Sequence, residues 1–167
     1  PLPCKGSTCL TQSEAQTIFE QGDYECYRLF SGDESGKLFA GTWLNYLAKN
    51  MEKRITSTTL GHPYMHFSAH DSSLAMILAA LKIYPKEFPP YASTLRFELW
   101  RQPSGENALH ILWNNVPVIP PGCTDGMCPF TDFKQLTQLL AIKDIDKECA
   151  LQRTSEPLIE VNQLYRS

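Results

Sequence analysis

The stretch YMHFSAHDSSLAMILAAL, residues 64–81, decides the fold that we expect for this chain. Its first six residues, 64–69, are typical of a short strand, and residues 72–82 are typical of a buried helix. His70 and Asp71 stand between them, although ionisable groups are costly to place beside buried apolar elements. A strand that leads directly into a helix predicts an α/β arrangement, and the two ionisable groups at the junction are candidates for chemistry.

Three further helices are predicted from the spacing of apolar residues, at residues 12–30, 37–54 and 129–141. Thr11 and Glu14 form a capping-box pattern at the start of the first helix, which we expect to be interrupted near Gly22-Asp23. Pro129 suits the first turn of the third helix, and residues 31–36 are predicted to be a loop.

A β-hairpin is predicted in the second half of the chain. Residues 95–100 place Leu and Phe on one face and Arg96, Glu98 and Trp100 on the other, which is the two-residue period of a strand. The turn PSGEN leads back into a second strand, and residues 116–122 are expected to add a short edge. This hairpin and the strand at residues 64–69 make a thin sheet, and the apolar helices could cover a larger one. We therefore expect strands to be missing from this chain.

The composition is that of an ordinary globular domain. The chain has 167 residues, of which 43% are hydrophobic and 20% charged, and its net charge is −3. No long run of Lys and Arg supports nucleic-acid binding, so no nucleic-acid partner is expected. The longest apolar run, Leu74 to Leu81, has eight residues, which is too short to cross a bilayer. The start, PLPCKGSTC, has neither Met nor a signal pattern, so we expect a mature product or a fragment.

Six cysteines allow 15 pairings, and two pairs are local. Cys123 and Cys128 flank a short turn rich in Gly and Asp, so their side chains could meet, and Cys4 with Cys9 is a second possibility. A C-x4-C pair could also be half of a zinc site. No companion C-x2-C or H-x3-H lies close by, so we favour disulfides in an exported protein and expect no metal.

Cys26 and Cys149 have no local candidate partner. They could pair with each other, with Cys4 or Cys9, or with a cysteine outside this chain.

The His70-Asp71 junction suits an anion. Ligands of α/β sheets bind beyond the carboxyl ends of strands, and a helix N-terminus offers free backbone N–H groups and a positive dipole end. His70 adds a donor, and Asp71 adds a carboxyl group that could act as a general acid if an adjacent anion raises its pKa. Together they suit a phosphate monoester. In the alternative reading, Asp71 or Ser72 is simply the helix N-cap and His70 satisfies local backbone groups.

Two other kinds of site are disfavoured. His62, His66 and His70 are spaced by four residues, which on a helix could bind a metal, but the local pattern is a strand and no carboxylate cluster completes the ligand set. A Ser-His-Asp hydrolase would need the motif G-x-S-x-G, and the sequence has none.

The sequence HFSAHDSSL resembles the second signature of the histidine acid phosphatases of the prostatic and lysosomal type. The likeness extends to FPPYAS at 88–93 and the following FELW, to PGCTDGMCPFTDF, to KECA, and to GTWLNYLAKNM upstream. It covers most of residues 1–150, which would be the C-terminal portion of a histidine acid phosphatase domain, and residues 151–167 would be a C-terminal tail.

This resemblance implies hydrolysis of phosphomonoesters at acidic pH on an α/β/α layered fold, without a metal or another cofactor. The family's nucleophile is a histidine in an N-terminal Arg-His-Gly-x-Arg-x-Pro motif, and it becomes a phosphohistidine. His70 matches a second histidine that contacts the phosphoryl group, and Asp71 matches the residue that protonates the leaving group. Glu98 lies on a matching strand, where the resemblance implies a structural role.

This chain departs from the family at the nucleophile, because none of its four histidines is preceded by Arg. We therefore expect it to supply the general acid and a phosphate-contacting histidine and to be inactive alone. The expected partners are the missing N-terminal half of the domain, a phosphate monoester or inorganic phosphate, and a second copy in a homodimer of the complete enzyme. The family also implies that Cys149 pairs outside this chain and that the location is secreted or lysosomal. The alternative is a non-catalytic binding module derived from the same fold.

Overall fold

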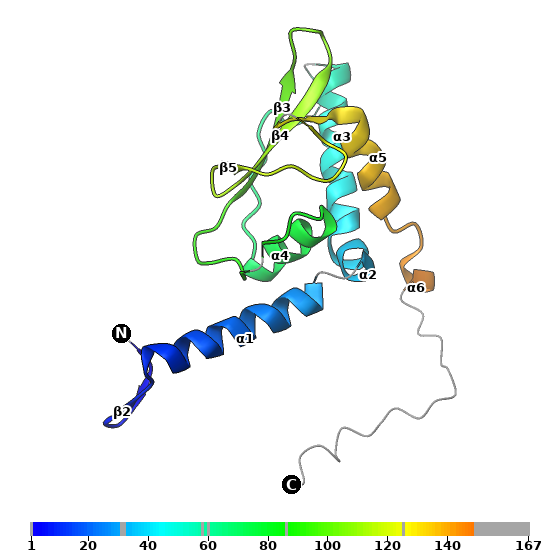
Figure 1. Ribbon diagram of the computed structural model, residues 1–167. Coiled ribbons are helices and arrows are strands. Elements are labelled where there is room, and N and C mark those ends of the chain that lie inside the picture. The colour runs from blue at the N-terminus through cyan, green and yellow to red at the C-terminus, as the bar shows by residue number, and fades with distance from the viewer. Residues whose placement is uncertain are drawn as a thin grey trace.

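The computed structural model describes residues 2–30, 33–57, 59, 61–85, 87–124 and 126–148 (Figure 1). Its helices are α1 (Gln12–Phe30), α2 (Asp33–Gly36), the π-helical turn η1 (Lys37–Gly41), α3 (Thr42–Thr56), α4 (Asp71–Ala80), α5 (Phe130–Leu140) and α6 (Ile145–Glu148). Its strands are β1 (Cys4–Lys5), β2 (Thr8–Cys9), β3 (Leu95–Arg101), β4 (Asn107–Trp113), β5 (Val116–Pro117) and β6 (Cys128–Pro129). The predicted α/β class is confirmed. The predicted tail, 151–167, lies outside the described residues.

The main sheet is built on the predicted hairpin. β3 and β4 pair antiparallel from Leu95 opposite Trp113 to Arg101 opposite Asn107. β5 is the short edge strand that the sequence predicted, and it pairs with β4 at Trp113 opposite Val116. β6 pairs with the other end of β4. The sheet is therefore small, as expected from the thin pattern of strands.

The predicted strand at residues 64–69 is not part of a sheet. The backbone at its end is extended, with φ −103° and ψ 163° at His70, but the described residues contain no strand paired with it. A strand is completed only by hydrogen bonds to a neighbour, and no described segment supplies them. The prediction of a strand at 64–69 is therefore wrong for the described residues, and the missing neighbour explains the difference.

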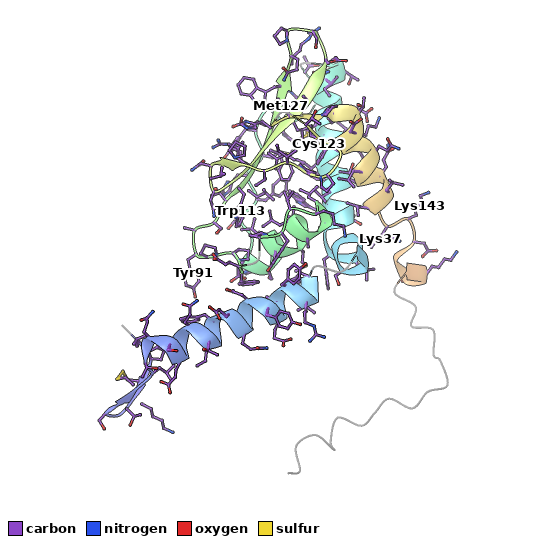
Figure 2. All side chains as sticks on the ribbon, viewed as in Figure 1. Lys37, Tyr91, Trp113, Cys123, Met127 and Lys143 are labelled. Atoms are coloured by element: carbon purple, nitrogen blue, oxygen red, sulfur yellow. A yellow bond between two sulfur atoms is a disulfide. The ribbon has the colours of Figure 1, made fainter. Side chains whose placement is uncertain are left out.

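The core lies between the hairpin and helices α3, α4 and α5. Its fully buried side chains include Leu44 of α3, Leu78 of α4, Leu109 of β4 and Phe133 of α5. Figure 2 shows side chains filling the space between these elements. Helix α4, which begins at the His70-Asp71 junction, is thus anchored in the core by its buried end.

Two helix boundaries differ from the sequence prediction. The predicted loop at 31–36 is helical from Asp33, because α2 packs closely on the end of α4, where a Cβ on Gly36 would lie 2.8 Å from the Ala80 Cα. At the start of α4, His70 is the N-cap in place of Asp71 or Ser72. α5 follows the prediction closely, with Pro129 as its N-cap.

Helix α1 has the predicted capping box and lacks the predicted interruption. The Thr11 N–H and hydroxyl both donate to Glu14 Oε2, at 2.8 and 2.7 Å, and the Glu14 N–H donates to Thr11 Oγ1 at 3.2 Å. The helix continues through Gly22, and Asp23 instead accepts a hydrogen bond from the Phe88 N–H at 3.0 Å. The N-terminal part of α1 extends away from the rest of the molecule (Figure 1).

The two local cysteine pairs are both disulfides, Cys4–Cys9 and Cys123–Cys128. Cys26 carries a free thiol in the described part of the chain, and Cys149 lies outside it. None of the described helices is long and apolar enough to cross a membrane.

Candidate functional site

His70 and Asp71 lie where an extended segment turns into α4. Both side chains are exposed, and they belong to consecutive residues, one extended and one helical. The local sequence explains this turn, because residues 74–81 form an apolar helix that packs into the core while the polar residues before it stay at the surface.

The N-terminus of α4 keeps backbone donors available. The side chain of His70 makes no capping hydrogen bond, and the first backbone bond runs from the Leu74 N–H to the His70 carbonyl at 3.2 Å. The Ser72 N–H donates to Asp71 Oδ1 at 2.7 Å. In the described residues the N–H groups of Asp71 and Ser73 find no acceptor. Free N–H groups at the positive end of a helix dipole suit an anion.

Helix α1 passes close to this junction. Cys26 packs in a small cluster with Phe30 of its own helix and with Ala75 and Ala79 of α4. Burial raises the pKa of the Cys26 thiol, and the negative charges of Asp23, Asp71 and Glu25 raise it further. The carboxyl group of Asp71 is therefore within electrostatic reach of α1.

Tyr84 lies at the same contact between α1 and α4. Its ring lies 5.9 Å from the ring of Tyr27, and its hydroxyl is buried without a hydrogen-bond partner in the described residues. Burial and the nearby negative groups raise the pKa of Tyr84 to about 12, so the hydroxyl stays protonated. The sequence did not single out this residue, because nothing in its spacing shows which helix covers it.

The two best-formed hollows among the described residues lie away from His70 and Asp71. A cavity of about 670 Å³ lies between α3 and the end of α5, and Lys143 at its rim stands well apart from the start of α4 in Figure 2. Its lining comprises Asn45, Lys49, Gln135, Gln138, Leu139, Ala141, Ile142 and Lys143. The candidate site at His70 and Asp71 is thus an exposed helix start, and the described residues do not enclose it.

Glu98 lies at the centre of a polar cluster on the outer face of the hairpin. Its carboxylate accepts from Trp100 Nε1 at 3.1 Å, pairs with Arg96 Nε at 2.8 Å, and faces His110 Nδ1 at 3.5 Å. The hydrogen bond from Trp100 is the main cause that lowers the pKa of Glu98, followed by the charge of Arg96 and then by His110. Three of these residues share the polar strand face predicted from sequence, and the register adds His110 directly opposite Glu98.

The spaced histidines do not converge. Within the described part of the chain, no three His, Cys, Asp or Glu side chains come together in a group that could hold a metal ion.

Comparison with known proteins agrees with the likeness found in the sequence. The family model of the histidine phosphatase superfamily (branch 2) matches residues 5–114. Lysosomal acid phosphatase of Xenopus laevis is 32% identical over 122 residues, covering 70% of this chain and 28% of the relative. The human lysosomal enzyme is 32% identical over 131 residues, covering 75% and 30%. Prostatic acid phosphatase of Bos taurus is 28% identical, covering 91% and 42%.

The chain therefore spans less than half the length of these relatives. The matched region contains the His70-Asp71 junction, α1, α3, α4 and the hairpin. More than half of the chain matches the family model, and this chain belongs to the histidine phosphatase superfamily, branch 2.

Proposed function

We propose that this chain is the C-terminal part of a histidine acid phosphatase and contributes to the hydrolysis of phosphomonoesters at acidic pH. The observation that carries the proposal is the exposed His70-Asp71 pair at a helix N-terminus with free N–H groups, in a chain of this family. The names of its relatives, lysosomal and prostatic acid phosphatase, support the reaction class.

The roles follow from the chemistry of each group. The phosphoryl oxygens bind to His70 and to the free N–H groups of α4. A histidine nitrogen from outside this chain attacks phosphorus, the bond to the leaving oxygen breaks, and Asp71 gives its proton to that oxygen. Water then attacks phosphorus, the bond between phosphorus and the histidine nitrogen breaks, the Asp71 carboxylate accepts the proton that the water releases, and inorganic phosphate leaves.

An acidic setting suits these roles. The names of the relatives, which are acid phosphatases, support this setting. A secreted or lysosomal location is supported by the two disulfides, which persist in oxidising compartments, and by the lysosomal relatives.

The reaction needs a nucleophile that this chain lacks, since its 167 residues contain no Arg-His-Gly. The isolated chain should be inactive, and the rest of the domain is the required partner. A homodimer of the complete enzyme belongs to the same proposal.

A chimera tests the proposed function directly. The matched region of human lysosomal acid phosphatase is replaced by this chain, and phosphate release from p-nitrophenyl phosphate is measured at pH 5. The chimera should turn over and the isolated chain should not, while His70→Ala and Asp71→Asn should each slow the chimera by about 10²–10⁴-fold. His62→Ala, which changes an exposed histidine away from the helix start, is the matched control. Activity of the isolated chain that survives both substitutions would refute the proposal.

The second candidate is a non-catalytic module that binds an anion. It is favoured by the free N–H groups of α4 in a chain without the nucleophile motif. Calorimetric titration of the isolated chain with inorganic phosphate separates the two. Binding that is lost in His70→Ala, combined with a chimera that folds but does not turn over, would favour the module.

A further inference from the structure

We propose that the groove between α3 and α5 binds the chain's own C-terminal segment SEPLIEV, residues 155–161. The groove is the cavity of about 670 Å³ described above, and this volume falls in the range of ~300–1,000 Å³ that is usual for binding sites. Lys143, at its rim, lies between α5 and α6 (Figure 2). Because the groove lies away from His70 and Asp71, the inference does not depend on the proposed function.

The lining of the groove combines an apolar patch with two cations. Leu139 is 73% exposed, although it is a large apolar side chain, and Ala141 and Ile142 lie beside it in the lining. Lys49 of α3 and Lys143 supply the cations. Within the described ranges, neither ammonium group has an ion-pair partner. The groove therefore suits a ligand that carries both carboxylates and an apolar side chain.

Three carboxamide side chains complete the lining, those of Asn45, Gln135 and Gln138. Each offers N–H donors and a carbonyl acceptor, and none of the three is engaged in a side-chain hydrogen bond with another residue that the structure describes. A carboxamide can bond to the N–H and to the C=O of a peptide backbone. The groove is thus equipped for a peptide as well as for side-chain charges.

The C-terminal segment carries the complementary sequence pattern. Glu156 and Glu160 stand on either side of Leu158. In an extended peptide, alternate residues share a face, so these three side chains would point the same way, with the two carboxylates roughly 13 Å apart along the backbone. An acidic, apolar and acidic order on one face matches a groove that has an apolar patch and two unpaired ammonium groups.

The segment is tethered close to the groove. Residues 141–143 line it, and α6 follows directly at Ile145–Glu148. Glu156 comes eight positions after Glu148, and a chain of that length reaches up to roughly 26 Å, whereas α6 is only about 6 Å long. A short tether gives an effective concentration in about the millimolar range, so contacts that are weak individually can hold the segment. This favours the chain's own segment over that of a second copy.

Hydrogen–deuterium exchange of the full chain tests the contact without any activity. The amides of residues 158–161 should exchange at least about tenfold more slowly, relative to a free peptide of the same sequence, in the unsubstituted chain than in Glu156→Gln/Glu160→Gln. Glu20→Gln/Glu25→Gln, which removes the same charge from exposed positions of α1, is the matched control and should keep the protection. Exchange at the free-peptide rate in the unsubstituted chain would overturn the proposal.

A charge swap tests the complementarity itself. Lys49→Glu/Lys143→Glu changes two exposed side chains and should remove the protection of residues 158–161. Adding Glu156→Lys/Glu160→Lys to that variant should restore it, because opposite charges face each other again. Salt at about 0.5 M should weaken the protection in both forms, since it screens exposed charges. Protection that survives the lysine substitutions would place the segment elsewhere and refute the groove as its site.

The concentration dependence separates the two sources of the segment. An intramolecular contact gives the same protection at every protein concentration, so protection that appears only in dimers would assign the groove to a second copy and overturn the proposal. The exchange measurement is repeated in the chimera with human lysosomal acid phosphatase, where the fold does not depend on the isolated chain. A chimera with fixed near-UV circular dichroism and unprotected residues 158–161 would also overturn it.

Discussion

At the residue scale, Asp71 is the group whose role can be separated from simple helix capping. Its carboxylate accepts from the Ser72 N–H at 2.7 Å, which satisfies one donor of the first helical turn, and its side chain is exposed beside the free donors of α4. A cap stabilises the helix whatever the substrate, whereas a proton donor matters most when the leaving oxygen is strongly basic.

In the chimera, Asp71→Asn should therefore slow an alkyl phosphate at least tenfold more than p-nitrophenyl phosphate, because an alkoxide needs protonation to leave far more than the nitrophenolate does. The readout is kcat/KM for both substrates at pH 5. Equal losses on both substrates, together with a lowered Tm, would assign Asp71 to capping alone.

Glu98 gives a prediction about pH and stability. Its pKa is lowered in the folded state by the hydrogen bond from Trp100 and by Arg96, so its ionised form favours folding. This contribution is present above the ordinary glutamate pKa of 4.5 and is lost as the pH falls through the lower folded value.

Glu98→Gln should lower the Tm at pH 6 by a few degrees, and the difference from the unsubstituted chain should shrink below about pH 4. Thermal melts followed by circular dichroism at pH 3 to 7 measure it. Glu106→Gln, at an exposed carboxylate in the hairpin turn, is the control. A Tm difference that grows at low pH would contradict this account.

At the element scale, apolar spacing was a good guide wherever a helix or strand has one buried face. It predicted α3, α4, α5 and the hairpin within a few residues. It was wrong near Gly22, where it predicted an interruption. The low helix propensity of glycine is a weak signal, and the contact between Asp23 and the Phe88 N–H outweighs it. It also missed α2, whose helical state depends on close packing against Ala80, a residue far away in the sequence.

Two glycines in helical segments should respond oppositely to the same substitution. A Cβ on Gly41 would overlap the carbonyl oxygen of Leu140, at the contact between η1 and α5, whereas a Cβ on Gly22 in α1 meets no atom within 4 Å. Gly41→Ala should cost about 1–3 kcal/mol of unfolding free energy, and Gly22→Ala should be neutral or stabilise by about 0.5–1 kcal/mol. Urea unfolding of the isolated chain measures both. A harmless Gly41→Ala would mean that the close approach of these two elements is wrong.

At the scale of the whole molecule, the sequence located the candidate residues but could not show what encloses them. The His70-Asp71 junction was readable because a strand pattern, two ionisable groups and a helix pattern follow one another. The walls of a phosphate site are made by long-range contacts, which no local sequence pattern encodes. The α/β class and the thin sheet are the global features that the pattern of elements did predict.

The exposed apolar side chains are a second property of the whole molecule, beside the thin sheet. Large side chains exposed along α1 include Ile18, Phe19 and Leu29, at 55%, 61% and 60%, and Tyr64 and Phe67 add to them. Many large apolar side chains exposed on one helix are a feature that a covering partner would explain. If the rest of a phosphatase domain covers them, the isolated chain should bind an apolar dye such as ANS, and the folded chimera should bind several-fold less per molecule.

The double variant Ile18→Gln/Leu29→Gln tests whether the dye binds to this surface of α1 or to a loosely packed chain. Both residues are exposed on one side of α1, eleven positions or about three helical turns apart, so polar replacements should lower dye binding by the isolated chain without lowering its Tm. If dye fluorescence stayed the same while near-UV circular dichroism showed no fixed packing, the dye would be reporting a molten chain. The α1 face would then not be a surface that the rest of the domain covers.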